Sequence, residues 1–203
     1  GEHEIKVRAK DSVGNYSAFG SHKAIVDTTS TEVPTPSAVS PTSNVNPIWS
    51  WQIIHDAVSY EIYLNDQSQG KQIETFFESP SLADGTNTIK VRAYDAVGNV
   101  SLFGSHSVLI DTTAPNIPQP ATQSPTNNNS PTWSWNFVAD ATQYEVILDE
   151  VLQSIQLTNT FTASVLSDGN HTLKVRTRDA LGNYSGYGTH VVTIDTASPT
   201  PPT

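Results

Sequence analysis

The sequence has 203 residues, with 20 acidic and 10 basic side chains, a formal net charge of −10 at pH 7, and no cysteine. This balance disfavours nucleic acid as a partner, because phosphate binding depends on clustered Lys and Arg. Disulfides and thiol chemistry are excluded, and no apolar run is long enough for membrane insertion. An acidic surface suits a protein that repels its own copies or collects cations.

An internal repeat organises the chain. The stretches VRAKDSVGNYSAFGSH, VRAYDAVGNVSLFGSH and VRTRDALGNYSGYGTH begin at Val7, Val91 and Val175, so each copy starts 84 positions after the previous one. The Trp-Ser-Trp of Trp49–Trp51 returns at Trp133–Trp135 with the same offset. We therefore predict the C-terminal part of a preceding repeat at 1–27, complete repeats at 28–111 and 112–195, and a linker to a further repeat at 196–203.

Within each repeat, apolar side chains recur at every second position, which is typical of strands with one buried face. The partial repeat supplies two such stretches, which predict a hairpin. In the first complete repeat the alternating stretches are, in chain order, Trp49–Ile53, Tyr60–Leu64, Ile89–Tyr94 and His106–Ile110. Turn-forming Gly, Asn and Asp separate them. About seven short strands per repeat predict an immunoglobulin-like sandwich.

The paired tryptophans are expected to supply much of each core, since one buried aromatic removes about 150–250 Å² from water. The stretches Trp49–Trp51 and Trp133–Trp135 share the alternation of Ile53 and Phe137. We therefore expect the tryptophans to face the core together with Ile53 and Phe137. The alternative is an exposed aromatic platform on which a sugar stacks.

Charged side chains on the other face predict pairing across strands. Glu61 and Glu145 are expected to point outward beside the stretches Lys90–Arg92 and Lys174–Arg176. Such exposed ion pairs contribute roughly 0.2–1 kcal/mol each. The two carboxylates therefore indicate strand pairing rather than glycoside chemistry, which needs a cleft and a raised pKa.

A histidine recurs at one strand position, as His22, His106 and His190. No second histidine stands at a spacing typical of zinc ligands. We expect a partly buried structural residue at this position. No nucleophile elbow, zinc-protease motif or phosphate loop occurs either, and we do not expect an enzyme.

Several motifs carry a resemblance to a known family. The Trp-Ser-Trp strand, the stretch DAVSYE at Asp56 and the stretch DGTNTIKVR at Asp84 resemble fibronectin type III or bacterial immunoglobulin-like units. The Asp-x-x-Gly-Asn-x-Ser loop at Asp95, followed by IDTTAP at Ile110, is similar to tandem repeats of giant bacterial surface adhesins. The resemblance implies an all-β chain of tandem immunoglobulin-like (fibronectin type III-like) β-sandwich domains in an elongated array. It also implies an extracellular or cell-surface stalk, often stiffened by calcium.

The Asp-x-x-Gly-Asn loop has two interpretations. The first is a turn alone, because Asp bonds the backbone ahead of it and Gly and Asn tolerate left-handed φ. The second adds half of a calcium site. In a sandwich of this kind the linker from one repeat enters the next near this loop, so oxygen ligands that suit Ca²⁺ would gather there. The candidate ligands are Asp27, Asp56, Asp95 and Asn99 at one joint, and Asp111, Asp140, Asp179 and Asn183 at the next.

The function expected from these patterns is mechanical: a stiff stalk or spacer of an extracellular bacterial surface adhesin or fibre, possible calcium included. Two alternatives stay open. One is a glycan- or protein-binding module, although the nearly identical loops favour structure over recognition. The other is a spacer of a secreted polysaccharide-degrading enzyme. The expected partners are neighbouring repeats of the same chain. The partial repeat at 1–27 also raises the hypothesis of strand complementation by another copy.

Overall fold

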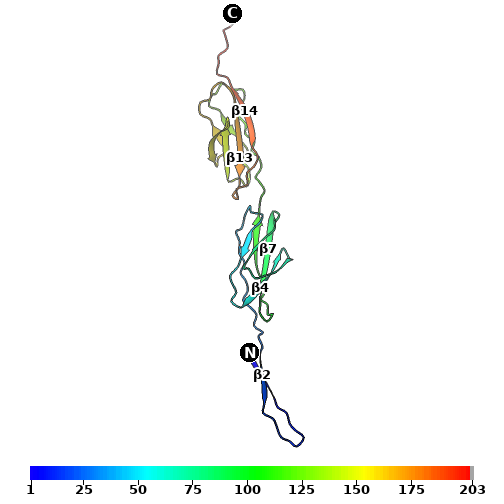
Figure 1. Ribbon diagram of the computed structural model, residues 1–203. Coiled ribbons are helices and arrows are strands. Elements are labelled where there is room, and N and C mark those ends of the chain that lie inside the picture. Colours follow the sequence, from blue (N-terminus) through cyan, green and yellow to red (C-terminus); the bar gives the residue numbers. More distant parts are fainter. Residues whose placement is uncertain (202–203) are drawn as a thin grey trace. The chain divides into compact units, whose positions relative to one another are not determined.

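The computed structural model describes residues 1–201, and the regular secondary structure in that range consists of β-strands (Figure 1). No helix in it is long and apolar enough to cross a membrane. The residues form two compact units. The first contains Gly1–Ser40, Asn46–Leu82 and Thr86–Val108, and the second contains the other residues, chiefly those from Leu109 onward. The boundaries 28–111 and 112–195 stay a prediction.

The first complete repeat contains two antiparallel sheets. One has four strands in the order β5-β4-β7-β8, and the other pairs β3 with β6. The bounds are β3 Ile48–Ser50, β4 Ala57–Leu64, β5 Gln67–Gln72, β6 Phe76–Glu78, β7 Gly85–Asp95 and β8 Gly104–Ile110. The segment before β3 joins the smaller sheet through backbone hydrogen bonds between Ser37 and Ser50, of 2.9 and 3.0 Å.

The second complete repeat has the same strands at matching positions. Its four-stranded sheet has the order β11-β10-β13-β14, and β12 pairs with β9. The bounds are β9 Thr132–Ser134, β10 Gln143–Leu148, β11 Val151–Gln156, β12 Thr160–Thr162, β13 Gly169–Arg178 and β14 Gly188–Ile194. Figure 1 shows β13 and β14 side by side. Two sheets with this strand order confirm the predicted all-β, fibronectin type III-like sandwich.

The first residues form only the predicted hairpin, of β1 Glu2–Val7 and β2 Gly20–Ile25. Ile5 and Val7 are 62% and 63% exposed, whereas their counterparts Ile89 and Val91 are fully buried. The alternation is the same in both places. Burial therefore depends on the second sheet that packs against the strand.

Both tryptophans of each pair are buried, as predicted. Trp49 and Trp133 are fully buried, and Trp51 and Trp135 are nearly so. The close edge-to-face contacts of Trp51 with Tyr60 and of Trp135 with Tyr144 extend this core. The large indoles thus lie between the sheets, and they offer no exposed platform for a sugar.

The inward placement of Ile53 and Phe137 was wrong. Ile53 is 81% exposed and Phe137 78% exposed, while the next residues, Ile54 and Val138, are 2% exposed. Strand β3 ends at Ser50, and the chain leaves the sheet directly after the second tryptophan, so the alternation no longer applies. The Ile54 N–H then donates to the Tyr60 hydroxyl at 3.0 Å, which fixes this turn against the core.

A glycine at the start of the last strand permits a close backbone approach. A Cβ on Gly104 would lie 1.7 Å from the Pro34 carbonyl oxygen, and one on Gly188 would lie 1.8 Å from that of Pro118. Real Cβ atoms essentially never approach another heavy atom within 3.0 Å. The segment that precedes β3 therefore packs directly against Gly104, and the segment that precedes β9 packs in the same way against Gly188.

Candidate functional site

The Asp-x-x-Gly-Asn loop between β7 and β8 is a turn closed by its own aspartate. Asp95 Oδ1 accepts the backbone N–H groups of Val97, Gly98 and Asn99 at 2.8–3.0 Å. Asp95 Oδ2 accepts the side-chain amide of Asn99 at 2.8 Å. Gly98 has φ of 99°, a conformation that favours glycine. The predicted turn is confirmed.

The other two copies of the loop form the same bonds between the aspartate and the asparagine. Asp179 accepts from the Leu181 and Asn183 backbones and from the Asn183 side chain at 2.8–2.9 Å. Asp11, in the exposed hairpin, accepts from Asn15 in the same way at 2.8 and 2.9 Å. Because the hairpin closes its turn without a surrounding sandwich, the turn is a local property of this sequence.

These hydrogen bonds keep the loop carboxylates ionised. Burial alone would raise the pKa of Asp95 and Asp179, but the bonds from the Asn99 and Asn183 side chains and from the backbone outweigh it. Both pKa values therefore lie below the ordinary aspartate value. In the hairpin the bond from the Asn15 side chain is the main cause of the lowered pKa of Asp11.

In the two complete repeats the asparagine of the loop also contacts the linker. Asn99 Nδ2 donates to the Asp27 carbonyl oxygen at 3.2 Å, and Asn183 Nδ2 donates to that of Asp111 at 3.0 Å. The topology of the expected sandwich had predicted that the linker approaches this loop. The contact uses a backbone carbonyl, so it needs no metal ion.

The six aspartates among the candidate calcium ligands line two hollows, whereas Asn99 and Asn183 line neither. Asp27, Asp56 and Asp95 border one of about 150 Å³. The set Asp111, Asp140 and Asp179 borders another, of about 360 Å³.

These aspartates are not arranged as a finished metal cage. In residues 1–201 no three His, Cys, Asp or Glu side chains converge as a metal site would require. The Asp95 and Asp179 oxygens accept N–H groups of their own loops, and Asp27 and Asp111 accept those of Thr29 and Thr113. Calcium binding by the eight candidate residues stays a prediction.

A second carboxylate, which the sequence had indicated only as a turn residue, holds the start of the linker. Asp84 Oδ1 accepts the Thr112 N–H at 3.0 Å and the Thr112 hydroxyl at 2.7 Å, while Oδ2 accepts the Thr113 hydroxyl at 2.8 Å. The hydrogen bonds from Thr112 and then Thr113 lower the pKa of Asp84. Asp168 binds Thr196 in the same way.

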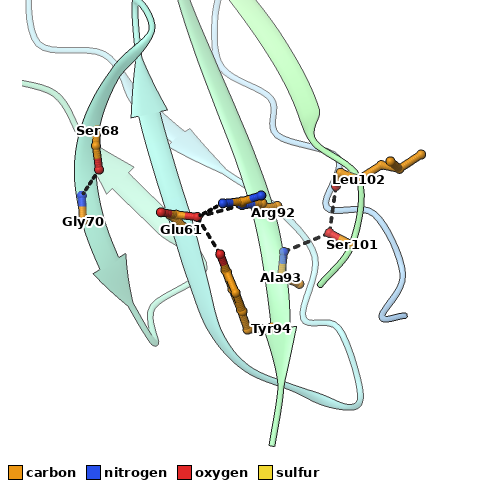
Figure 2. Close-up of polar contacts among 8 residues, drawn as sticks. All are labelled: Glu61, Ser68, Gly70, Arg92, Ala93, Tyr94, Ser101 and Leu102. Atoms are coloured by element: carbon orange, nitrogen blue, oxygen red, sulfur yellow. Dashed lines mark hydrogen bonds and ion pairs between the residues drawn. The ribbon is translucent and has the colours of Figure 1, made fainter. Parts of the chain in front are cut away.

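The predicted pairing across the outer face is confirmed (Figure 2). Arg92 contacts Glu61 Oε2 through Nε at 2.7 Å and through a terminal nitrogen at 2.6 Å, and the Tyr94 hydroxyl donates to the same oxygen at 2.8 Å. Burial raises the pKa of Glu61, but the bonds from Tyr94 and Arg92 outweigh it and leave the pKa lowered. A lowered pKa suits an ion pair and not a general acid.

The second repeat builds its outer face from a related set. Arg176 donates to both oxygens of Glu145 at 2.9 and 3.0 Å, and the Tyr187 hydroxyl adds a bond of 2.8 Å. The Arg176 guanidinium also lies over the rings of Tyr184 and Tyr187, with centroid distances of 4.1 and 4.9 Å. In both repeats, the partly buried glutamate of the outer face therefore pairs with arginine and tyrosine side chains of the same repeat.

The recurring histidine occupies a structural position in the complete repeats. His190 Nδ1 accepts the Trp133 indole N–H at 3.2 Å. His106 Nδ1 is buried and has no hydrogen-bond partner among the described atoms, and the same holds for Trp49 Nε1. His22 lies in the exposed hairpin.

Comparisons with known proteins place this chain beside segments of larger enzymes. No family model matches it. Exoglucanase B of Cellulomonas fimi is 31% identical over 194 residues, which cover 87% of this chain and 18% of that protein. Chitinase A1 of Niallia circulans is 30% identical over 191 residues, covering 86% of this chain and 27% of that protein. The chain thus spans about a fifth to a quarter of the length of these relatives.

Solved structures with a similar fold were also found. Fibronectin(III)-like modules of Clostridium thermocellum CbhA give a TM-score of 0.44 at 14% identity, covering 79% of this chain and 94% of that one. The FN1-FN3 domains of chicken CNTN1 give the same score and identity, covering 96% and 76%. The chain is all-β and consists of repeats with a fibronectin type III-like fold, and it is similar in sequence to segments of an exoglucanase and of a chitinase.

Proposed function

We propose that this chain is a spacer within an extracellular polysaccharide-degrading enzyme. The observation that carries the proposal is its similarity, over 87% and 86% of its length, to segments of an exoglucanase and of a chitinase. Those names denote different activities. A segment shared by both is unsuited to deciding which polymer is cut, and a mechanical role fits both proteins equally well.

The contacts at the start of the linker support this role. Asp84 holds Thr112 and Thr113 against the repeat that the chain is leaving. Pro115, Pro118 and Pro120 follow, and each restricts φ. A linker that is hydrogen-bonded at its start and restricted by proline beyond it is a semi-rigid spacer rather than a loose tether.

The outer faces of the sheets support a spacer over a binding module. Glu61 and Glu145, two acidic groups of these faces, are already bonded to arginine and tyrosine side chains. A glycan ligand would have to displace those bonds. A stalk of a surface adhesin uses the same mechanical properties, but the two relatives favour the enzyme.

A segment exchange in exoglucanase B tests the proposal. The matching segment is deleted, replaced by the whole 203-residue chain, or replaced by a Gly/Ser linker of equal length. We expect deletion to lower hydrolysis of insoluble glucan more than hydrolysis of soluble oligosaccharide. We expect this chain to restore hydrolysis of the insoluble glucan better than the flexible linker does. An exchange that behaves like the deletion would refute the spacer role.

A binding experiment with the isolated 203-residue chain distinguishes a spacer from a binding module. The chain is incubated with insoluble glucan or chitin and the polymer is sedimented, and we expect a spacer to stay in the supernatant. Retention on either polymer would instead identify a binding module.

A further inference from the structure

A histidine of the second repeat lies between two hydrogen-bond acceptors. His171 Nδ1 is 2.6 Å from Asp149 Oδ2, and Nε2 is 2.9 Å from the Ser167 carbonyl oxygen. Carboxylate and carbonyl oxygens only accept, so both ring nitrogens must carry hydrogen for both contacts to be hydrogen bonds. The doubly protonated, positively charged imidazolium meets this condition. Either neutral tautomer leaves one nitrogen lone pair facing an oxygen.

The first repeat has an uncharged pair at the matching positions. Asn65 and Asn87 stand 84 positions before Asp149 and His171, and Asn65 Nδ2 donates to Asn87 Oδ1 at 2.8 Å. Asn65 and Asp149 also share a left-handed φ, of 49° and 48°. Each accepts a backbone N–H from β7 or β13, at 2.9 and 2.8 Å. An amide pair does not titrate, so the first repeat is a built-in control for the second.

The other charged groups near His171 are occupied elsewhere. Glu150 pairs with Lys174 at 2.5 Å. Asp168 accepts from the Thr196 N–H and hydroxyl. On the neighbouring strand β14, the residue in register with His171 is the apolar Val192.

The electrostatic effects agree with this geometry. The hydrogen bond to Asp149, followed by that to Ser167, raises the pKa of His171 against the opposing effect of burial. For Asp149, burial raises the pKa, but the bonds from His171 and Thr172 outweigh it and the pKa is lowered. The partners therefore favour each other's charged form.

We propose that Asp149 and His171 form a pH-sensitive clasp that stabilises the second repeat, and not the first, under mildly acidic conditions. The clasp joins the β10–β11 turn to β13 and, through the Ser167 carbonyl, to the segment that precedes Asp168. Because Asp168 holds Thr196, protonation of His171 also tightens the point at which the chain leaves this repeat.

The sign of the effect follows from the two pKa shifts. A raised histidine pKa gives stability that is complete below the ordinary value of 6.5 and is lost as the pH rises through the folded-state value. A lowered aspartate pKa gives stability that is complete above the ordinary value of 3.8 and is lost as the pH falls through the folded-state value. The clasp is therefore strongest between these two limits.

Proton NMR of the full chain tests the proposal directly. The imidazole resonance of His171 is assigned by its loss in His171→Asn and followed from pH 5 to 9. We expect a midpoint above 6.5, and a lower midpoint in Asp149→Asn. A midpoint at or below 6.5 in the unchanged chain would overturn the proposal.

Thermal unfolding gives the second readout. The double variant Asp149→Asn/His171→Asn copies the first repeat's pair. We expect the melting temperature of the second repeat to fall by several degrees between pH 5.5 and 8.5 in the unchanged chain, and this fall to be absent from the double variant. The reverse graft, Asn65→Asp/Asn87→His, is expected to give the first repeat such a fall. Equal pH dependence in the unchanged chain and the double variant would refute the clasp.

Discussion

Replacement of Gly188 by alanine is expected to unfold the second repeat under conditions in which the first stays folded. The added Cβ would lie 1.8 Å from the Pro118 carbonyl oxygen. To reach the 3.0 Å limit, the Pro118 backbone would have to move by 3.0 − 1.8 = 1.2 Å. The obstacle is main chain, so no side-chain rotation relieves it.

The size of the effect follows from what holds the Pro118 segment in place. Asn116 accepts a hydrogen bond from Thr177 Oγ1, and Ala121 exchanges two backbone bonds with Ser134 at 2.8 and 3.0 Å. A shift of the segment weakens these three bonds, at about 0.5–1.5 kcal/mol each. The strain of forcing a methyl group into packed structure adds about 1–3 kcal/mol. We expect a total loss of about 3–5 kcal/mol, or at least about 12 °C in the melting temperature of a repeat of this size.

Matched glycines make the assay internally controlled. Gly104→Ala meets the same obstacle at Pro34 and should destabilise the first repeat by a similar amount. Gly20 is the corresponding residue of the hairpin, where the nearest atom, the Val7 carbonyl oxygen, would be an ordinary 3.8 Å away. Gly20→Ala should therefore leave stability within about 0.5 kcal/mol of the unchanged chain.

Tryptophan fluorescence reports the outcome. All four tryptophans lie in the two complete repeats, two in each. Thermal melts of the three variants are compared with the unchanged chain. If Gly188→Ala melts within about 2 °C of the unchanged chain, the close-packing argument fails. An equal loss in Gly20→Ala would show that glycine is needed there for another reason.

Three further predictions concern the polar contacts. Glu145→Gln should lower the free energy of unfolding by about 1–2 kcal/mol at pH 7, because the charge-assisted bonds from Arg176 and Tyr187 are weakened. Since hydrogen bonds from Arg176 lower the Glu145 pKa, this loss of stability should shrink as the pH falls below 4.5. Urea unfolding at pH 7 and pH 3 measures the loss and its pH dependence. Asp84→Ala should speed hydrogen exchange of the Thr112 amide, and unchanged exchange would contradict its role. For the predicted calcium sites, replacing chelator by saturating calcium should raise the melting temperature. Calcium at 100 times the dissociation constant would add about 2.7 kcal/mol of stability. An unchanged melting temperature would refute the prediction of calcium sites.

The strands could be predicted because their pattern is local. Ile89, Val91 and Ala93 alternate along β7 and are all fully buried, as the period of two requires. The same reasoning failed at Ile53 because a period of two holds only while the strand lasts. The three residues of β3 are too few to show from the sequence where it ends.

The contacts at the ends of the repeats could be predicted only where the topology of the expected sandwich brings two segments together. The expected sandwich topology placed the Asp27 segment near the Asn99 loop before any contact was known. The binding of Thr112 by Asp84 and the approach of Pro34 to Gly104 join segments that are far apart in sequence. No periodic pattern connects such residues, so each had only its local interpretation as a turn or a flexible position.

The Asp-x-x-Gly-Asn loop combines two separable roles. Its aspartate closes the turn in every copy, including the hairpin, where Asp11 and Asn15 form the same bonds in an exposed setting. The turn therefore accounts for the aspartate. It does not account for the second bond of the asparagine side chain, which Asn99 and Asn183 donate to linker carbonyl oxygens. The aspartate shapes the loop, the asparagine attaches the linker to it, and a cation would act on a contact that the protein already makes.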